Sequence, residues 1–207
     1  MSGDSVMRAI RIGERVAARI VWHQLRLRVG TWSAFGVLLR VAWQKLRGAP
    51  FRELGPPRDR RDRLSRRQCG DLILLDRAVR RTADDETAMA VARAAVLAGA
   101  VPFLDAMLPD AGLDELAQLG PTIAASFFNA EGEASVEGED FCFKVRTCRF
   151  VELLGAADAR HLGPLFCEAD NVYFDGKRKL ITLRRTQTLA TGGDHCDFRF
   201  SRASRER

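Results

Sequence analysis

The chain has 207 residues, of which 46% are hydrophobic and 29% are charged, and its formal net charge is +6. These proportions exclude a disordered or fibrous chain and fit one soluble domain, or one domain with a helical extension. The five cysteines form no CxxC pair and no signal peptide opens the sequence, so we expect free thiols in a cytoplasmic, reducing compartment.

Charge is distributed unevenly along the chain. Residues 1–81 hold 19 Lys and Arg against 7 Asp and Glu, residues 82–140 hold 1 against 12, and residues 141–207 hold 13 against 8. Such blocks could attract nucleic acid or anionic lipid, or they could neutralise one another within the fold. Because no nucleic-acid-binding motif is recognisable, we expect complementation within the protein or between subunits, and no nucleic-acid partner.

The N-terminal region predicts two helices, preceded by residues 1–13, which show no clear pattern and are expected to fray. Residues 14–28 form an amphipathic repeat, Gly30 ends it, and Thr31 is placed to cap the second helix. The second helix repeats large apolar residues at steps of three and four: Trp32, Phe35, Leu39, Trp43 and Leu46. This run is too short to span a membrane. We expect the rest of the chain, or a second copy in a homodimer through the N-terminal helices, to cover it, with peripheral membrane contact ranked third.

The middle of the chain is predicted to be helical. Residues 48–65 are interpreted as a linker from their Gly, Pro and charge content, and Ser65 is placed to cap a helix over residues 66–81. Thr82 and the acidic residues after it begin another helix. This helix is expected to reach about residue 97, to loosen at Gly99 and to resume past Pro102.

An acidic connector is predicted between the helical and the mixed parts of the chain. Two short helices are expected at residues 113–119 and 122–128, and the glycine-containing residues 131–140 follow them. We therefore divide the chain into residues 1–65, 66–140 and 141–207, with 66–207 as one domain.

The C-terminal part predicts a sheet. Residues 141–147 alternate as a strand, with Phe141, Phe143 and Val145 on one face. The remaining elements are expected in this order: helices at 150–154 and 157–169, then strands at 171–174, 179–190 and 195–201. The fold class is α+β, with a helical N-terminal half and a C-terminal antiparallel sheet of about four strands that has helices packed on one face.

Most of the reactive side chains fall between residues 167 and 200. Cys167 and Asp170 are three positions apart, so they lie near one another on a helical turn. Cys196 lies on the last strand between His195 and Asp197. A cysteine near positive charge can act as a nucleophile, a carboxyl group can move a proton, and Arg184 or Arg185 can hold a carboxylate.

Each of these residues also has a structural interpretation. Cys196 shares the parity of Phe198 and Phe200, as a small core residue would, which places His195 and Asp197 on the other face, as on a solvated edge. Asp170 is also suited to end a helix. Thr186 and Thr188 are good strand formers whatever else they do. The cysteines and histidines are not paired at zinc-finger spacing, so we expect no metal and no cofactor.

Three motifs in this stretch resemble the L-2-amino-thiazoline-4-carboxylic acid hydrolase family. They are Cys167-x-x-Asp170, then Arg185-Thr186-x-Thr188-Leu189-Ala190-x-Gly192, then Cys196-Asp197-Phe198-x-Phe200. Upstream, Val145 to Phe150 looks like the family's first strand running into a helix, and the resemblance covers about residues 141–200.

The resemblance implies a hydrolase that opens a carbon–nitrogen bond in a small cyclic amidine or thiazoline-like carboxylate. The residues assigned to catalysis are Cys167, Asp170, Cys196 and His195, although a histidine at position 195 is not part of the family pattern. Those assigned to substrate binding are Arg185, Thr186, Thr188 and Asp197. The alternative is a module that binds or senses a small molecule in the same pocket without turnover. If the site is one unit, the helix end at Cys167 must pack over the start of the last strand.

Overall fold

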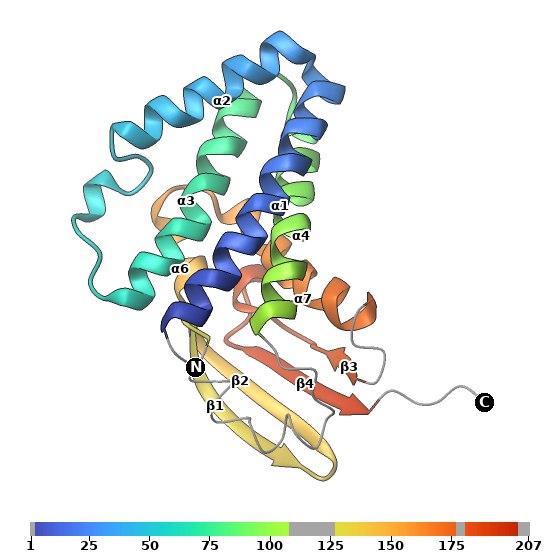
Figure 1. Ribbon diagram of the computed structural model, residues 1–207. Coiled ribbons are helices and arrows are strands. Elements are labelled where there is room, and N and C mark those ends of the chain that lie inside the picture. Colours follow the sequence, from blue (N-terminus) through green and yellow to red (C-terminus); the bar gives the residue numbers. More distant parts are fainter. Residues whose placement is uncertain (1–2, 108–126, 177–180, 203–207) are drawn as a thin grey trace.

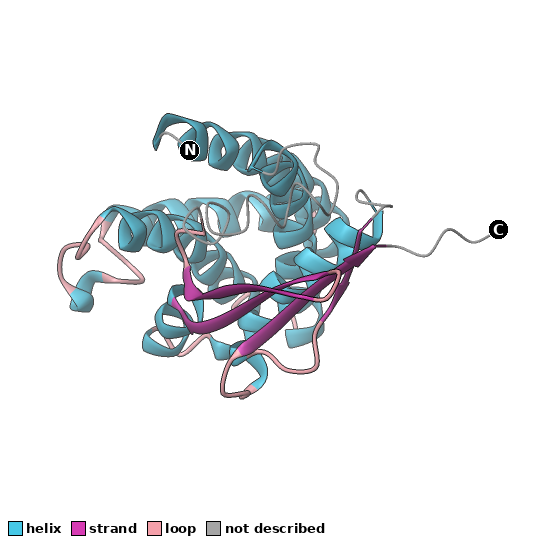
Figure 2. Ribbon diagram, turned by 90° about the horizontal axis from the view of Figure 1, so that it is seen from below, coloured by secondary structure: helices cyan, strands magenta, loops and turns pink. Residues whose placement is uncertain are grey.

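The computed structural model describes residues 3–107, 127–176 and 181–202. A layer of helices, α1–α4, makes up the N-terminal half, and a four-stranded antiparallel sheet with further helices makes up the C-terminal half (Figure 1). Figure 2 shows the strands as one layer with helices behind it. The predicted α+β class is therefore confirmed. The expected helix at 113–119 and most of that at 122–128 lie outside the described residues.

The first helix begins much earlier than predicted. Helix α1 spans Gly3–Val29, so the expected fraying is wrong for residues 3–13; residues 1 and 2 lie outside the described residues. Val6, Ala9 and Ile10 are buried at helical spacing because α1 packs along α4. Gly30, with a φ of 83°, separates α1 from α2 (Thr31–Leu46). The N-cap position of α2 is Gly30, and Thr31 is already helical, so Thr31 is not the cap.

Helix α2 turns its smaller residues inward. Ala34 and Val37 are buried, whereas Trp32, Leu39 and Trp43 are 87%, 71% and 60% exposed. The expectation that the rest of the chain covers this stripe is therefore wrong, because the buried face of the helix is the opposite one.

Helix α3 (Arg60–Arg80) starts inside the segment predicted as a linker. The Asp59 side chain caps it by accepting a hydrogen bond from the Asp62 N–H at 2.8 Å. Ser65 is consequently buried within the helix and does not cap it. The short helix η1 (Arg52–Leu54) lies in the preceding loop.

Helix α4 (Asp85–Met107) begins where the acidic cluster predicted. Asp84 accepts a hydrogen bond from the Thr87 N–H at 2.7 Å. The helix continues through Gly99 and Pro102 without the predicted interruption. Gly99 instead marks a close crossing with α1, because a Cβ on Gly13 would lie 2.4 Å from the Gly99 carbonyl oxygen.

By length and composition alone, α4 is the one described helix that is long and apolar enough to cross a membrane. It packs against α1, α3 and α7, which places it at the centre of the helical layer. These contacts bury 28% of its apolar window, so packing accounts for only part of its apolar composition.

The strand order is β1-β2-β4-β3, and every pair is antiparallel. Strand β1 (Ala130–Glu137) occupies most of the stretch predicted as an acidic connector and pairs with β2 (Asp140–Cys148). Most of β1 is exposed, so its sequence lacks the buried alternate face by which strands are recognised. Strand β2 agrees with the prediction, since Phe141, Phe143 and Val145 are buried.

The elements after β2 depart from the predicted order. Helices α6 (Arg149–Ala156), η2 (Arg160–Leu162) and α7 (Gly163–Gly176) follow it. The predicted strand at 171–174 is the last part of α7, which buries Tyr173 and Phe174. Strand β3 covers only Ile181–Arg184; η3 (Leu189–Thr191) and β4 (Cys196–Arg202) complete the chain.

Candidate active site

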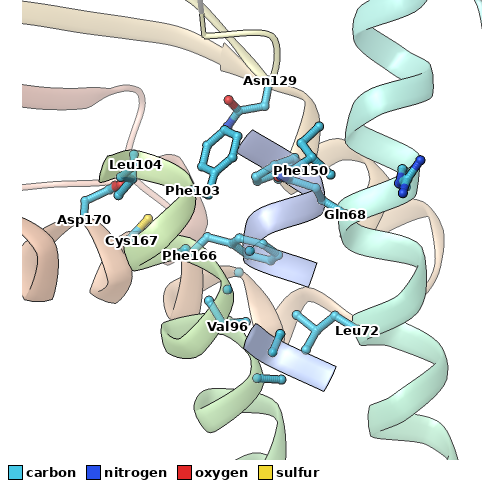
Figure 3. Close-up of a pocket in the computed structure, with 18 of the residues that line it drawn as sticks. Gln68, Leu72, Val96, Phe103, Leu104, Asn129, Phe150, Phe166, Cys167 and Asp170 are labelled. Carbon is cyan, nitrogen blue, oxygen red and sulfur yellow. The ribbon is translucent and has the colours of Figure 1, made fainter. Parts of the chain in front are cut away.

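One face of the sheet and the helix α7 form part of the wall of a cavity of about 640 Å³ that is partly open to solvent. Cys196, Phe198 and Phe200 alternate on β4 and all line it, as do the inward residues of β2. Other walls come from α1, α2, α3 and α4, and most of these residues are apolar. Figure 3 shows Cys167 and Asp170 beside Leu104, with Phe166 and Phe150 further along and Leu72 and Val96 beyond.

Helix α7 supplies the two reactive side chains that the sequence placed three positions apart. Leu165, Ala169 and Tyr173 are buried at four-residue steps and fix the inward face of this helix. Cys167 and Asp170 both line the cavity. Cys196 lines it too, so the predicted packing of the Cys167 helix over the start of the last strand is observed.

Arg185 ties the end of β3 to α7. Its Nη1 donates to Asp170 Oδ2 at 3.0 Å, and its Nη2 donates to the Cys167 carbonyl oxygen at 2.5 Å and to Asn171 Oδ1 at 2.7 Å. The guanidinium also lies 4.8 Å from the Phe198 ring centroid, a cation–π distance. The side chain is only 5% exposed. These contacts make Arg185 a residue that positions Asp170.

The Asp170 carboxyl group is partly buried, and the charge of Arg185 offsets only part of the effect of burial on its pKa. Its side chain is 24% exposed, and it lines the cavity, where protein atoms surround it. Burial raises the pKa of Asp170, the charge and hydrogen bond of Arg185 lower it, and the result is a pKa of about 6. Asp170 can therefore gain and lose a proton near neutral pH.

Three thiols line the same cavity as this carboxyl group. Burial, with the nearby Asp170 charge, raises the pKa of Cys167 to about 11 although Arg185 and the Thr188 side chain act in the opposite direction. Burial also raises the pKa of Cys196, whose sulfur accepts a hydrogen bond from the Leu189 N–H at 3.3 Å. All five cysteines of the chain are free.

Cys148 is the third thiol, and the sequence analysis did not assign it to the site. It ends β2 where the chain enters α6, and it lines the same cavity. Burial raises the pKa of Cys148, the Val151 and Phe150 N–H groups lower it, and the neighbouring Cys167 and Asp170 raise it further. Its position at the strand–helix junction is the one signal that the sequence offers.

Asp197 points to the other face of β4 and fixes the loop after β3. Its carboxylate accepts hydrogen bonds from the Thr186 N–H at 3.0 Å, the Thr186 hydroxyl at 2.6 Å and the Gln187 N–H at 2.9 Å. Burial acts to raise the pKa of Asp197, but these hydrogen bonds outweigh it and hold the pKa below its ordinary value. Asp197 and Thr186, which were each predicted to bind substrate, thus contact one another. We call this set of hydrogen bonds the loop clamp, because it holds the loop after β3 on β4.

His195 lies apart from the thiols. Its Nε2 is 3.4 Å from Gln187 Nε2, and His195 is not among the described residues that line the cavity. The loop here turns at Gly192, whose φ of 92° is a backbone conformation that glycine adopts readily. The structure therefore brings Cys167, Asp170, Cys196 and Arg185 together and leaves His195 outside that group.

A smaller polar recess of about 280 Å³ lies on the other side of Cys167. Its described lining residues come from α7 and from the loop between β3 and β4: Pro164, Cys167, Glu168, Asn171, Arg185, Thr186, Gln187, Thr188 and Thr191. Cys167 is common to the recess and the cavity. Thr188, predicted to bind substrate, lies in the recess with its hydroxyl 3.0 Å from that of Thr191.

A metal centre finds no support in the part of the chain that the structure describes. No three His, Cys, Asp or Glu side chains there are grouped so as to hold a metal ion. The described cluster of thiols with Asp170 and Arg185 is suited to proton transfer and nucleophilic attack.

Comparison with known proteins supports the resemblance noted in the sequence. A match to the L-2-amino-thiazoline-4-carboxylic acid hydrolase family covers residues 63–200, about two thirds of the chain. It takes in α3 and α4 as well as the sheet and α7. Searches of the curated proteins and of the solved structures found no match. The extent of the family match shows that this chain belongs to the L-2-amino-thiazoline-4-carboxylic acid hydrolase family.

Proposed function

We propose that the protein is a hydrolase that opens a carbon–nitrogen bond in a small cyclic amidine or thiazoline-like carboxylate. One observation carries the proposal: Cys167 and Asp170 share one wall of the cavity, and Arg185 holds Asp170 near a pKa of about 6. A group with such a pKa is suited to general acid–base catalysis at neutral pH. The family match supports the same reaction class.

In the proposed reaction, Asp170 accepts the proton of the Cys167 thiol as the sulfur bonds to the amidine carbon. The Cys167 thiol needs such a base, because its pKa of about 11 keeps it protonated at neutral pH. The amidine reacts in its protonated form, so the ring nitrogen of the tetrahedral adduct already carries one proton. Asp170 gives this nitrogen the thiol proton, the ring carbon–nitrogen bond breaks to release an amine, and the carbon remains bound to sulfur as a protonated thioimidate. Water finally attacks the carbon still bound to sulfur and restores the thiol.

The polar recess is the proposed position of the substrate carboxylate. Arg185 lines it, and its positive charge attracts an anion although Nη1 and Nη2 already donate to protein groups. Thr186 and Thr188 contribute polar atoms beside it. Asp197 is proposed to act indirectly, by holding the Thr186 backbone in place. His195 remains a predicted catalytic residue with no contact to the thiols.

A second candidate function is binding without turnover. The observation that favours it is the protonated state of the Cys167 thiol, together with a cavity whose walls are mostly apolar. Such a pocket could retain a small molecule that a sensor or carrier recognises. The cytoplasmic location expected from the free thiols is compatible with both functions and stays a prediction.

A panel of cyclic amidine and thiazoline carboxylates, with product formation followed by mass spectrometry, separates the two functions. We expect turnover by the unaltered protein and a loss of roughly 10²–10⁴-fold in Cys167→Ala and Asp170→Asn. Cys142→Ser is the matched control, because Cys142 pairs with Arg199 on β4 and is not among the described residues lining the cavity or the recess. Stoichiometric binding with no product at any pH would refute the hydrolase and favour the binding module.

A further inference from the structure

Helix α2 carries an exposed apolar stripe on the side opposite to its buried face. The stripe consists of Trp32, Phe35, Leu39, Trp43 and Leu46, all of which are exposed. At 100° per residue these positions fall within a narrow arc, and the buried Ala34 and Val37 lie across the helix from them. Figure 1 shows α2 along the upper edge of the helical layer, away from the sheet.

The stripe continues onto the end of α1. Leu27 is exposed there, and the Trp22 ring lies 4.9 Å from that of Phe35, which joins the two helices across the bend at Gly30. Several large apolar side chains on one outer surface form a patch of the kind that marks an interaction site.

The segment that carries this patch is strongly basic and contains no acidic residue of its own. Residues 15–52 contain eight Lys and Arg and no Asp or Glu: Arg15, Arg19, Arg26, Arg28, Arg40, Lys45, Arg47 and Arg52. Within the described residues, Lys45 is the member of this set that forms an ion pair, with Asp71. Arg26 and Arg47 instead lie over the Trp22 and Trp43 rings, at 5.7 and 6.0 Å.

A second copy of the chain offers little negative charge to meet these arginines. The sequence analysis expected the acidic residues 82–140 to do so, but the described ones are largely engaged within their own chain. Asp85 pairs with Arg80, Glu131 with Arg61, Glu133 with Arg146, and Glu137 and Asp140 with Arg199. A two-fold contact through α2 would also set like charges against each other.

We propose that the α1–α2 surface docks on an anionic lipid membrane. Tryptophan rings would lie at the level of the lipid headgroups and Leu39 and Leu46 would enter the acyl boundary, while the arginines meet lipid phosphates. The helix lies flat on the surface and does not cross it. The sheet and α7, which carries Cys167 and Asp170, lie away from α2 (Figure 1). Although the cavity extends to α2 at Leu38, Val41 and Ala42, docking through the outer face of α2 leaves its Cys167–Asp170 end away from the membrane.

The three tryptophans of the chain, Trp22, Trp32 and Trp43, all belong to this surface, so their fluorescence reports on it directly. The test adds the full-length protein to mixed vesicles of phosphatidylcholine and phosphatidylglycerol, and to vesicles of phosphatidylcholine alone. We expect a blue shift of the emission and co-sedimentation with the mixed vesicles, both weakened by salt. Light scattering before lipid is added should give the mass of a monomer.

Two exposed double variants keep every tryptophan. Leu39→Gln with Leu46→Gln should weaken vesicle binding at least about tenfold, because two large apolar groups no longer enter the lipid. Arg26→Gln with Arg28→Gln should weaken it about fivefold for each charge removed. Val136→Gln is the matched control on the exposed strand β1 and should bind as the unaltered protein does.

Two results would overturn the proposal. One is a dimer in lipid-free solution that the Leu39→Gln, Leu46→Gln variant converts to monomer, with no vesicle binding, because the stripe would then be a homodimer seam. The other is a monomer whose tryptophan emission does not respond to anionic vesicles at all.

Discussion

The buried pair of Arg185 and Asp170 yields a prediction with a definite sign. Arg185→Met removes the only cation that contacts this carboxyl group in the described structure, together with three hydrogen bonds. Leaving one member of a buried pair unpaired costs about 3–5 kcal/mol of unfolding free energy. In the double variant, Arg185→Met with Asp170→Asn, no charge remains buried, so we expect most of that loss to be recovered.

The loss of unfolding free energy in Arg185→Met should depend on pH. The folded-state pKa of Asp170, about 6, lies above its ordinary value, so the native state binds a proton more tightly than the unfolded chain does. Stability therefore falls as pH rises from about 4 to about 6 and then levels off. Without Arg185 the pKa rises further, at about 1.4 kcal/mol for each additional unit. The Arg185→Met variant should consequently be much less stable at pH 8 than at pH 5. The stability of the double variant should differ little between these two pH values.

Urea unfolding followed by circular dichroism at both pH values measures these differences. Arg199→Met is the matched control, because Arg199 pairs with Glu137 and Asp140 in solvent and should change stability little at either pH. The reasoning fails if Arg185→Met is destabilised equally at both pH values and the double variant is no more stable than the single one. The contribution of Arg185 would then be packing and not charge.

Three further variants test other parts of the structure by the same unfolding assay. Asp62→Asn should cost about 3–5 kcal/mol, since buried Asp62 accepts from both Arg66 and Arg149; a loss below about 1 kcal/mol would mean that this junction of α3 with α6 is not held by charge. Asp197→Ala should cost about 1–2 kcal/mol at pH 7, and the difference should vanish as acid protonates Asp197 through its lowered pKa; a cost independent of pH would contradict the loop clamp. Gly132→Ala should cost about 1–3 kcal/mol, because its Cβ would lie 2.1 Å from the Lys144 carbonyl oxygen; an unchanged midpoint would contradict the irregular β1–β2 pairing at this residue.

The sequence predicted best the elements whose signals are local. The alternation of β2 and the parity of Cys196, Phe198 and Phe200 were both visible, and Asp84 marked the start of α4. Local signals failed where tertiary packing decides. Asn171 to Phe174 has strand-forming residues, yet α7 continues through them because Tyr173 and Phe174 are buried on its inward side.

The sequence placed Cys167, Asp170 and Cys196 where they line one cavity, but it did not predict the contacts that hold them. Cys167 and Asp170 follow from helical spacing, and Cys196 from strand parity. No spacing rule could show that Arg185 reaches back to α7, because that contact depends on where β3 ends. Cys148 lies 19 residues before Cys167 in the sequence and joins it only through the packing of β2 and α6 against α7.

Helix α2 shows why a sequence pattern cannot decide which face of a helix is inside. Its apolar residues cover more than half of its girth, so either face could be packed against the protein. The larger side chains would ordinarily be expected inside, since they hide more apolar surface. Instead, α2 packs against α3 through its small residues Ala34 and Val37. This leaves Trp32, Leu39 and Trp43 facing outward. This exposed stripe, on a segment with eight Lys and Arg and no Asp or Glu over residues 15–52, is the basis of the proposed docking on a negatively charged surface.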